Sequence, residues 1–325
     1  MKHSSIASTC ALSALFALAL TPTTHADSSS ASPSPSPSVS TAASEATPST
    51  SPTASAHATP SEAAPTTTTI TTPPPTSISP ADAIRQRWQD MGGENGVLGT
   101  AASELVPLRD GAFIQFYRGG QIYWTAQYGA HASHDGIHGA YSAQKWENGP
   151  LGFPTSDEEN QTIAGIRGAL QTYENGEIRW SARGGAHPIW GKILERYKTA
   201  ETEGRSLGWP LSDEMKDAAD GGAYQHFTGG SIYYHPRTGA HRVTGGIRNL
   251  WEAQGWERGQ MGYPTGEETA TANGGVYQTF QGGTAYWHPQ AGSYYVHGAM
   301  LGAYGRAGYE WGRYGYPLSN ETPSA

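Results

Sequence analysis

Aromatic and amide side chains recur at fixed positions after residue 80 of this 325-residue chain. One set follows a series of turns and consists of Trp124, Trp180, Tyr234 and Trp287. A second set precedes the same turns and consists of Gln115, Gln171, Gln225 and Gln278. Aromatic faces accept the C–H faces of sugar rings, and amides hydrogen-bond hydroxyl groups. The pattern suits carbohydrate binding, although the buried aromatics of a hydrophobic core would give the same spacing.

A tyrosine column runs beside the first set. Tyr123, Tyr233 and Tyr286 each precede one of those aromatic residues, and Arg179 takes their place in the second copy. Because successive side chains of a strand point to opposite faces, one column should be exposed when the other is buried. The alternation does not decide which column this is, so both are candidate ligand contacts.

Three histidines form a further column of candidates, His131, His187 and His241. They could contact sugar hydroxyls or a metal, or they could be partly buried and hydrogen-bonded to the local backbone. Tyr294 replaces the histidine in the fourth copy, which argues against a shared metal role. His131 and His134 have an H-x-x-H spacing, but it occurs once and without a recurring acid nearby. We therefore predict no metal site and no cofactor.

A repeat of about fifty residues organises all these columns. Leu98-Gly99, Leu151-Gly152, Leu207-Gly208, Met261-Gly262 and Tyr314-Gly315 recur at spacings of 53, 56, 54 and 53 residues. The last four pairs open the blocks LGFPTSDE, LGWPLSDE, MGYPTGEE and YGYPLSNE, each with an aromatic residue and a proline. The first block, LGTAASEL, has neither.

These blocks resemble the LGFP repeat, and the resemblance covers residues 84–325. Repeats of that family occur alone or joined to mycoloyltransferases and peptidoglycan-cleaving enzymes of corynebacteria and related actinobacteria. There they hold the protein to the cell wall through arabinogalactan. The resemblance thus implies a cell-wall-binding protein. The first copy departs from the family pattern, as does the fifth, which stops at Ala325 before its hairpin.

Each copy is predicted to contain a short helix, a tight loop and a β-hairpin. An aliphatic residue stands 14 positions before each Leu-Gly pair and an aromatic residue four positions later, which indicates a helix with one buried face. These pairs are Ile84 and Trp88, Ile137 and Tyr141, Ile193 and Tyr197, Ile247 and Trp251, and Met300 and Tyr304. The proline of the block fixes its own φ and keeps the preceding aromatic residue out of a helical conformation, so the block is predicted to be a tight loop. The hairpin turns at Gly119-Gly120, Asn175-Gly176, Gly229-Gly230 and Gly282-Gly283, and a short third strand follows.

Each block also carries a polar residue after its Ser or Gly: Asp157, Asp213, Glu267 and Asn320. Short polar side chains in this setting usually cap a turn, so we predict a structural role, with ligand contact as the alternative.

The expected fold is mainly β with short helices. A small hairpin is marginal by itself, so its apolar face must be covered by a neighbouring repeat. Because five helix-and-loop blocks are present and closure leaves no free ends, we predict a propeller-like ring with approximate five-fold symmetry. An open solenoid is the alternative.

The first 80 residues have a different composition. Lys2 and His3 precede the apolar run Ile6–Leu20, so residues 1–26 are predicted to be a secretory signal peptide. Residues 27–80 are rich in Ser, Thr, Pro and Ala and contain no Gly, Lys, Arg, Phe, Trp or Tyr, which predicts a disordered tether. The repeat domain, 81–325, divides into 84–136, 137–192, 193–246, 247–299 and a partial copy, 300–325.

Charge and cysteine content narrow the expected partners. Residues 81–325 carry a net charge of −6 without a basic cluster, so nucleic acid is not expected. No apolar run is long enough to span a bilayer as a helix, so membrane insertion is not expected either. The single cysteine, Cys10, lies in the signal peptide. We expect a secreted monomer at the cell wall or cell surface.

No motif for catalysis is present: the chain has no G-x-S-x-G, H-E-x-x-H or P-loop sequence. The notable features occur three to five times, which suits weak sites acting together. We therefore predict a non-catalytic protein that binds envelope polysaccharide, either arabinogalactan or a peptidoglycan-linked glycan, through several repeats. The alternatives are a glycan-acting enzyme or an accessory of wall-remodelling enzymes, and a protein-interaction or adhesion scaffold that uses exposed tyrosines.

Overall fold

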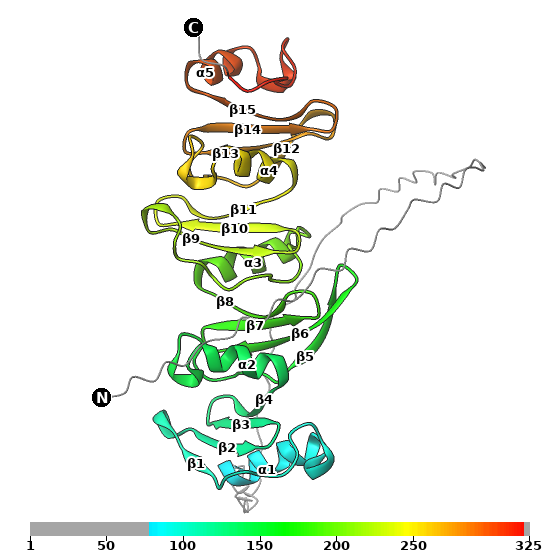
Figure 1. Ribbon diagram of the computed structural model, residues 1–325, viewed down its shortest axis with the longest axis vertical. Helices are drawn as coiled ribbons and strands as arrows, with labels where there is room; N and C mark the ends of the chain where they lie inside the picture. Colours follow the sequence, from blue (N-terminus) through cyan, green and yellow to red (C-terminus); the bar gives the residue numbers. More distant parts are fainter. Residues whose placement is uncertain (1–77, 322–325) are drawn as a thin grey trace, which may run out of the picture. The chain divides into compact units, whose positions relative to one another are not determined.

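The computed structural model describes residues 78–321. Within this range the chain forms four small antiparallel β-sheets and five short α-helices, which alternate along the sequence (Figure 1). The predicted mainly β fold with short helices is confirmed. The predicted signal peptide and tether lie outside the described residues, except for positions 78–80 of the tether.

The helices occur where the pairs of aliphatic and aromatic residues predicted them. They are α1 (Pro80–Asp90), α2 (Asp135–Ala143), α3 (Gly191–Thr202), α4 (Gly245–Ala253) and α5 (Gly298–Arg306). Ser79 caps α1 by accepting a hydrogen bond from the backbone N–H of Asp82 at 3.2 Å. The aliphatic member of each pair is buried in α1 to α4, whereas Met300 in α5 is 60% exposed.

Each sheet is built around the predicted hairpin. The first contains β1 (Val106–Pro107), β2 (Phe113–Tyr117), β3 (Gly120–Thr125) and β4 (Gly129–His134). The second contains β5 (Glu159–Ile163), β6 (Ile166–Tyr173), β7 (Gly176–Ser181) and β8 (Gly185–Trp190). The third contains β9 (Ala223–Phe227), β10 (Gly230–His235) and β11 (Gly239–Val243). The fourth contains β12 (Thr269–Ala270), β13 (Val276–Phe280), β14 (Gly283–His288) and β15 (Gly292–His297).

The strand before the hairpin was not predicted. This strand is β1, β5 or β12, and it pairs with the first strand of its hairpin, β2, β6 or β13. In the third repeat an isolated bridge between Met215 and Tyr224 takes its place. Two of these strands are only two residues long, which is too short to leave a period of two in the sequence.

One hydrogen bond, repeated five times, explains the Leu-Gly pair. The aromatic residue of each helix donates to the carbonyl oxygen of the glycine at 2.6–3.0 Å. The donors are Trp88, Tyr141, Tyr197, Trp251 and Tyr304, and the acceptors are Gly99, Gly152, Gly208, Gly262 and Gly315. The acceptors have φ between +62° and +73°, a conformation that favours glycine.

The aromatic residue of the loop joins its repeat to the preceding one. Trp209 is fully buried, and its Nε1 donates to the carbonyl oxygen of Ile166 in β6 at 3.0 Å. A Cβ atom on Gly168 would lie 2.5 Å from the Trp209 ring, so glycine is needed for this contact. Tyr263 likewise donates to the carbonyl oxygen of Ala219. The predicted tight loop is thus also a joint between repeats.

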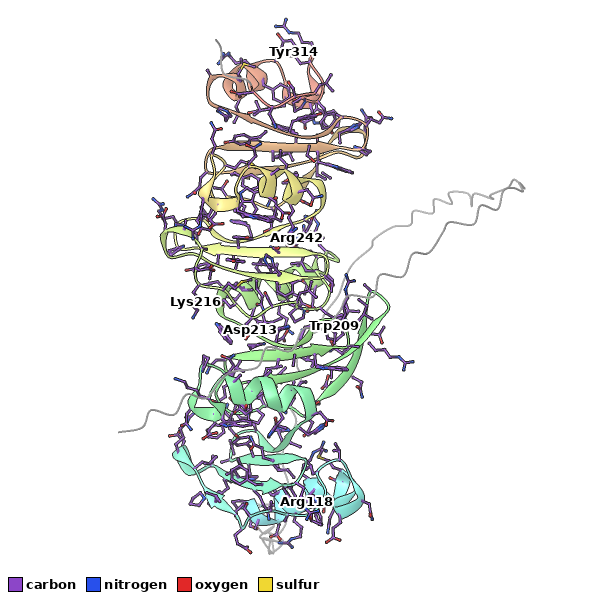
Figure 2. All side chains as sticks on the ribbon, viewed as in Figure 1. Arg118, Trp209, Asp213, Lys216, Arg242 and Tyr314 are labelled. Atoms are coloured by element: carbon purple, nitrogen blue, oxygen red, sulfur yellow. The ribbon has the colours of Figure 1, made fainter. Side chains whose placement is uncertain are left out.

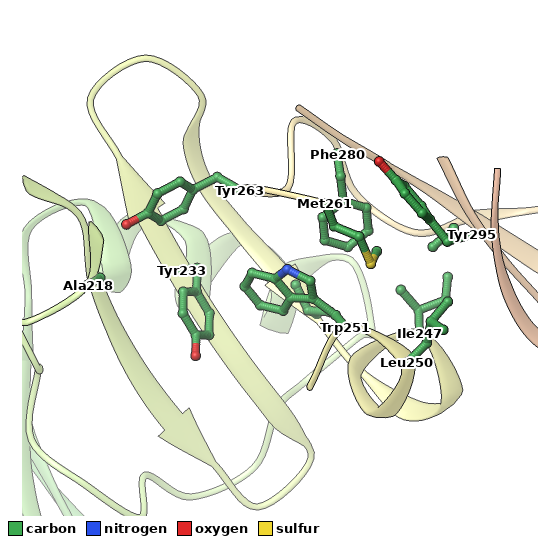
Figure 3. Close-up of a cluster of buried hydrophobic side chains, with 11 residues drawn as sticks. Ala218, Tyr233, Ile247, Leu250, Trp251, Met261, Tyr263, Phe280 and Tyr295 are labelled. Carbon is green, nitrogen blue, oxygen red and sulfur yellow. The ribbon is translucent and has the colours of Figure 1, made fainter. Parts of the chain in front are cut away.

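The hydrophobic core extends across the repeat boundaries. One cluster brings Tyr233 and Ala218 of the third repeat together with residues of the fourth (Figure 3). The members from the fourth repeat include Ile247, Leu250, Trp251, Met261, Tyr263, Phe280 and Tyr295. Helix α2 similarly contacts β4 of the first sheet and β7 and β8 of the second. Both faces of an inner sheet are therefore covered by helices and loops.

The structure shows no closed ring. The main contacts between elements run within one repeat or from one repeat to the next, as in an array whose units contact only their neighbours. In the described residues the fifth copy adds α5 and a loop but no sheet. The predicted five-fold closure is therefore not shown, because the number of blocks does not by itself require the ends to meet.

Candidate functional site

The glutamine column lies inside the molecule. Gln171, Gln225 and Gln278 are fully buried. The Nε2 group of each donates to a backbone carbonyl of the preceding repeat at 2.6–2.9 Å and to its own loop at 2.8–2.9 Å. Gln115, in the first repeat, is half-buried and donates to the carbonyl oxygen of Ser103 at 3.1 Å. A sugar hydroxyl has no access to the three buried amides, which instead connect consecutive repeats.

The tyrosine column is also buried. Tyr123, Tyr233 and Tyr286 are only 1–3% exposed, and burial raises the pKa of their hydroxyl groups. The hydroxyl of Tyr123 donates to Glu147 Oε2 at 3.1 Å, across the boundary to the second repeat. Arg179, at the same position, is buried and paired with Glu177 at 2.6 Å. These side chains face the following repeat and are not open to a ligand.

The histidine column joins each repeat to the loop of the next. Nε2 of His131, His187 and His241 lies 2.8 Å from a nearby backbone carbonyl, as expected for a histidine bonded to its local backbone. Nδ1 faces an acid of the following repeat: Asp157 at 3.4 Å, Asp213 at 2.7 Å and Glu267 at 3.2 Å. Asp213 and Trp209 both lie against the second sheet (Figure 2).

Asp157, Asp213 and Glu267 have the predicted structural role, but they bond to the preceding repeat instead of capping their own turns. Asp157 accepts the backbone N–H of Ala132 at 3.1 Å and lies 3.0 Å from Arg87 Nε. Burial opposes its ionisation, but the bonds from His131 and Ala132 and the charge of Arg87 hold its pKa below the ordinary value. Histidine and acid are 26 residues apart in all three copies, and this constant separation was the signal that could have revealed the pairing.

The remaining column lies where the core meets the surface, and Trp124, Tyr234 and Trp287 pack against core clusters. Trp180 is 37% exposed, and Trp124, Tyr234 and Trp287 are partly buried. Within the described residues, the indole N–H groups of the three tryptophans in this column form no hydrogen bond. By contrast, Trp88, Trp209 and Trp251 each donate to a backbone carbonyl. The two groups of tryptophans therefore differ in hydrogen bonding: one is bonded to the backbone of loops and strands, and the other is not.

Small side chains flank two of the surface rings. Trp180 in β7 lies between Ala169 of β6 and Ala186 of β8. Tyr234 in β10 lies between Ala223 and Ala240 in the same way. Trp124 has Phe113 and Ala130 as neighbours, and Trp287 has Val276 and Ser293. Since alanine covers little of a neighbouring ring, this arrangement suits a planar aromatic platform.

A hollow lies beside the hairpin turn in two of the repeats, and the sequence does not predict it. In the first repeat it has a volume of about 450 Å³ and is lined by residues 116–121 together with Asp135, His138 and Trp146. The second repeat has a hollow of about 670 Å³ at the corresponding place, lined by residues 172–177 and the start of α3. Burial lowers the pKa of His138. Different side chains line the two hollows. No residue type therefore recurs at a fixed position that would predict them from the sequence.

The sequence repeats match a known protein-family model. The LGFP repeat matches residues 98–149, 151–204, 207–259 and 261–312, which together exceed half of the chain. The chain belongs to the LGFP repeat family. Each LGFP match begins at a Leu-Gly or Met-Gly pair, so it contains the loop and sheet of one repeat and the helix of the next. LGFP repeats are associated with cell-wall binding. A comparison with curated proteins finds no match.

Among residues 78–321 of this LGFP repeat protein, no helix is long and apolar enough to cross a membrane. The histidine, aspartate and glutamate residues in the same range form no group of three or more that could hold a metal ion.

Proposed function

We propose that this protein is a non-catalytic, secreted cell-wall-binding protein that attaches to envelope polysaccharide through the surface column of Trp124, Trp180, Tyr234 and Trp287. The observation that carries the proposal is that, among residues 78–321, the indole N–H groups of these three tryptophans find no acceptor, whereas those of Trp88, Trp209 and Trp251 donate to backbone carbonyls. An aromatic face with a donor at its edge matches a sugar ring, which has an apolar C–H face bordered by hydroxyl groups.

Repetition supports binding over catalysis. A single partly exposed platform binds weakly, but linked sites on one chain raise the overall affinity by factors of roughly 10² or more. The platforms lie at the same strand position in each of the four sheets, after the central hairpin turn. A polysaccharide offers matching repetition, because many equivalent sugar residues lie along one chain. The proposed partner is therefore a polymer rather than a single small molecule.

The glycan proposed is arabinogalactan, or another glycan linked to peptidoglycan. Support comes from the association of LGFP repeats with cell-wall binding and from the absence of a basic cluster in residues 81–325, which favours a neutral polymer. A scaffold that uses exposed tyrosines gains no support, since Tyr123, Tyr233 and Tyr286 are buried.

Co-sedimentation with purified cell walls tests the proposal. The full chain should pellet with intact walls and less with walls stripped of arabinan, and the walls should release no sugar during the incubation. Retention that is equal on stripped walls would move the binding site to peptidoglycan. Absence of retention on intact walls at physiological salt would refute the proposal.

A further inference from the structure

The third repeat differs from its neighbours where the surface column meets the helix. In the second and fourth repeats a glycine of the helix lies against the indole, and a Cβ atom on Gly136 or Gly246 would lie 2.8 Å or 2.1 Å from Cδ1 of Trp180 or Trp287. In the third repeat Lys192 stands at the glycine position, and Tyr234 stands at the tryptophan position. A cavity of about 310 Å³ is present beside these two residues.

The residue that precedes the helix differs as well. In three other junctions a glutamate of the following loop accepts the backbone N–H of this residue. Glu158 accepts from His134, Glu268 accepts from Thr244, and Glu321 accepts from His297. At the second of the four junctions the residue is Trp190, and within the described residues Glu214 accepts no hydrogen bond.

Glu214 is therefore a carboxylate with unused acceptor capacity. Its side chain is 11% exposed, and its one charged partner in the part of the chain that the structure describes is Lys216, whose Nζ lies 3.5 Å away. Lys216 is labelled in Figure 2, and its Nζ also lies 5.9 Å from the centre of the Trp190 ring. A carboxylate so nearly buried is costly to leave without donors, so a ligand that supplies them would be favoured.

The cavity combines the groups that hold a sugar. Trp190 and Tyr234 supply ring faces, Glu214 supplies acceptors, and Lys216 supplies donors. A volume of about 310 Å³ lies at the small end of the range for ligand pockets, about 300–1,000 Å³. Lys192 is held at the surface by Glu195 at 2.8 Å, so it contributes little free positive charge.

We propose that this cavity is a specialised subsite that binds one neutral sugar residue of the wall glycan. The inference rests on the proposed function and goes beyond the equivalent platforms of the surface column. The sugar's C–H face lies on Tyr234 or Trp190, two of its hydroxyl groups donate to Glu214, and Lys216 donates to a third oxygen. An acidic sugar is disfavoured because Glu214 would repel its carboxylate, and the charge of Lys216 is already offset by Glu214.

Titration calorimetry with neutral oligosaccharides released from arabinan and galactan tests the subsite. Glu214→Gln should weaken binding by the full chain about tenfold, as expected from the loss of hydrogen bonds to a charged acceptor. Its melting temperature should not change, because Glu214 supports no backbone group in the structure. Glu268→Gln is the matched control, since its carboxylate serves Thr244, and it should leave affinity within about twofold.

A second variant rebuilds the neighbouring arrangement. Lys192→Gly combined with Tyr234→Trp should place an indole against the helix and fill the cavity, so it should weaken oligosaccharide binding as much as Glu214→Gln. If wild type binds and neither variant weakens the affinity, the subsite is refuted while the proposed function stands. If wild type binds neither the oligosaccharides nor the wall, both proposals fail.

Discussion

The third and fourth repeats share one backbone arrangement but use it differently at a single junction. Both have the helix aromatic bonded to the glycine carbonyl, Tyr197 to Gly208 and Trp251 to Gly262. In the fourth repeat Gly246 packs on Trp287, and Glu268 bonds to Thr244. In the third, the corresponding side chains leave a cavity, and within the described range Glu214 accepts no hydrogen bond and lies 3.5 Å from Lys216 Nζ.

The comparison separates positions that build the repeat from positions that can vary. The loop residues, the buried glutamines and the helix aromatics make the same contacts in both repeats. Three edge positions, Trp190, Lys192 and Tyr234, differ from Thr244, Gly246 and Trp287 of the fourth repeat, while the hairpin and the strand after it pair in the same way. An array of this kind can therefore keep its joints while individual repeats acquire their own surface chemistry.

The largest expected effect comes from removing a joint. Trp209→Ala should lower the free energy of unfolding by about 3–5 kcal/mol, because it leaves a cavity and an unpaired Ile166 carbonyl. Trp180→Ala is the matched control and should cost less than about 1 kcal/mol, since its ring is partly exposed and makes no hydrogen bond. Urea unfolding gives both values, and equal losses would contradict the division of tryptophans into two groups.

The next largest effect on stability is expected in the first turn of α4, compared with the first turn of α3. Gly246→Ala should destabilise by about 1–3 kcal/mol, because the new Cβ would lie 2.1 Å from Trp287 Cδ1 and the ring must move. Lys192→Ala, at the same position in the third repeat, should change the free energy of unfolding by less than about 0.5 kcal/mol. Thermal unfolding compares the two variants. Tolerance of alanine at both positions would show that the indole contact is not tight.

A smaller effect is expected from the two glutamates. Glu268→Ala removes the acceptor for the backbone and side chain of Thr244 and should cost about 1 kcal/mol. Glu214→Ala removes no such bond and should be nearly neutral, as judged by the midpoint of urea unfolding. A comparable loss in both variants would mean that Glu214 also supports the helix start, and the third repeat would then not be distinct.

The smallest effect is a pH dependence at the same junction. The hydrogen bond to Asp213 raises the pKa of His187, so the protonated imidazole is favoured in the folded state. Its contribution should be complete below the unfolded pKa of about 6.5 and should be lost as the pH rises through the folded value. Asp213→Asn should remove a contribution of about 0.5 kcal/mol at pH 6 and less at pH 9. An unchanged difference across this range would contradict the ion pair.

Much of the framework could be predicted from the sequence. The repeat period of about fifty residues revealed the Leu-Gly pairs, and the four-residue spacing of Ile137 and Tyr141 predicted a helix. The alternation of side chains on either side of the glycine turns predicted the hairpins. These are local signals, set within one turn of helix or two neighbouring strands. The positive φ at Gly152 and its bond from Tyr141 could not be read in this way, because eleven residues separate the two.

The site was less predictable because its partners lie in different repeats. Gln171 was a candidate sugar-binding residue, but its Nε2 donates a hydrogen bond to the carbonyl oxygen of Ala132 in the preceding repeat. Alternation gave two columns without deciding between them, since inner sheets are covered on both faces and the tyrosines meet the following repeat. A single sequence shows how often a residue recurs. It does not show which neighbouring copy the side chain reaches.

The central claim is that the surface column binds glycan. Its most direct test is the dissociation constant for isolated arabinogalactan of a variant in which Trp124, Trp180 and Trp287 are all changed to Ala, with folding confirmed by circular dichroism. Trp311→Ala is the control, since that ring is 74% exposed and lies outside the column. We expect the triple variant to bind at least about 100-fold more weakly while the control binds like wild type. Equal binding by the folded triple variant and wild type would contradict the claim.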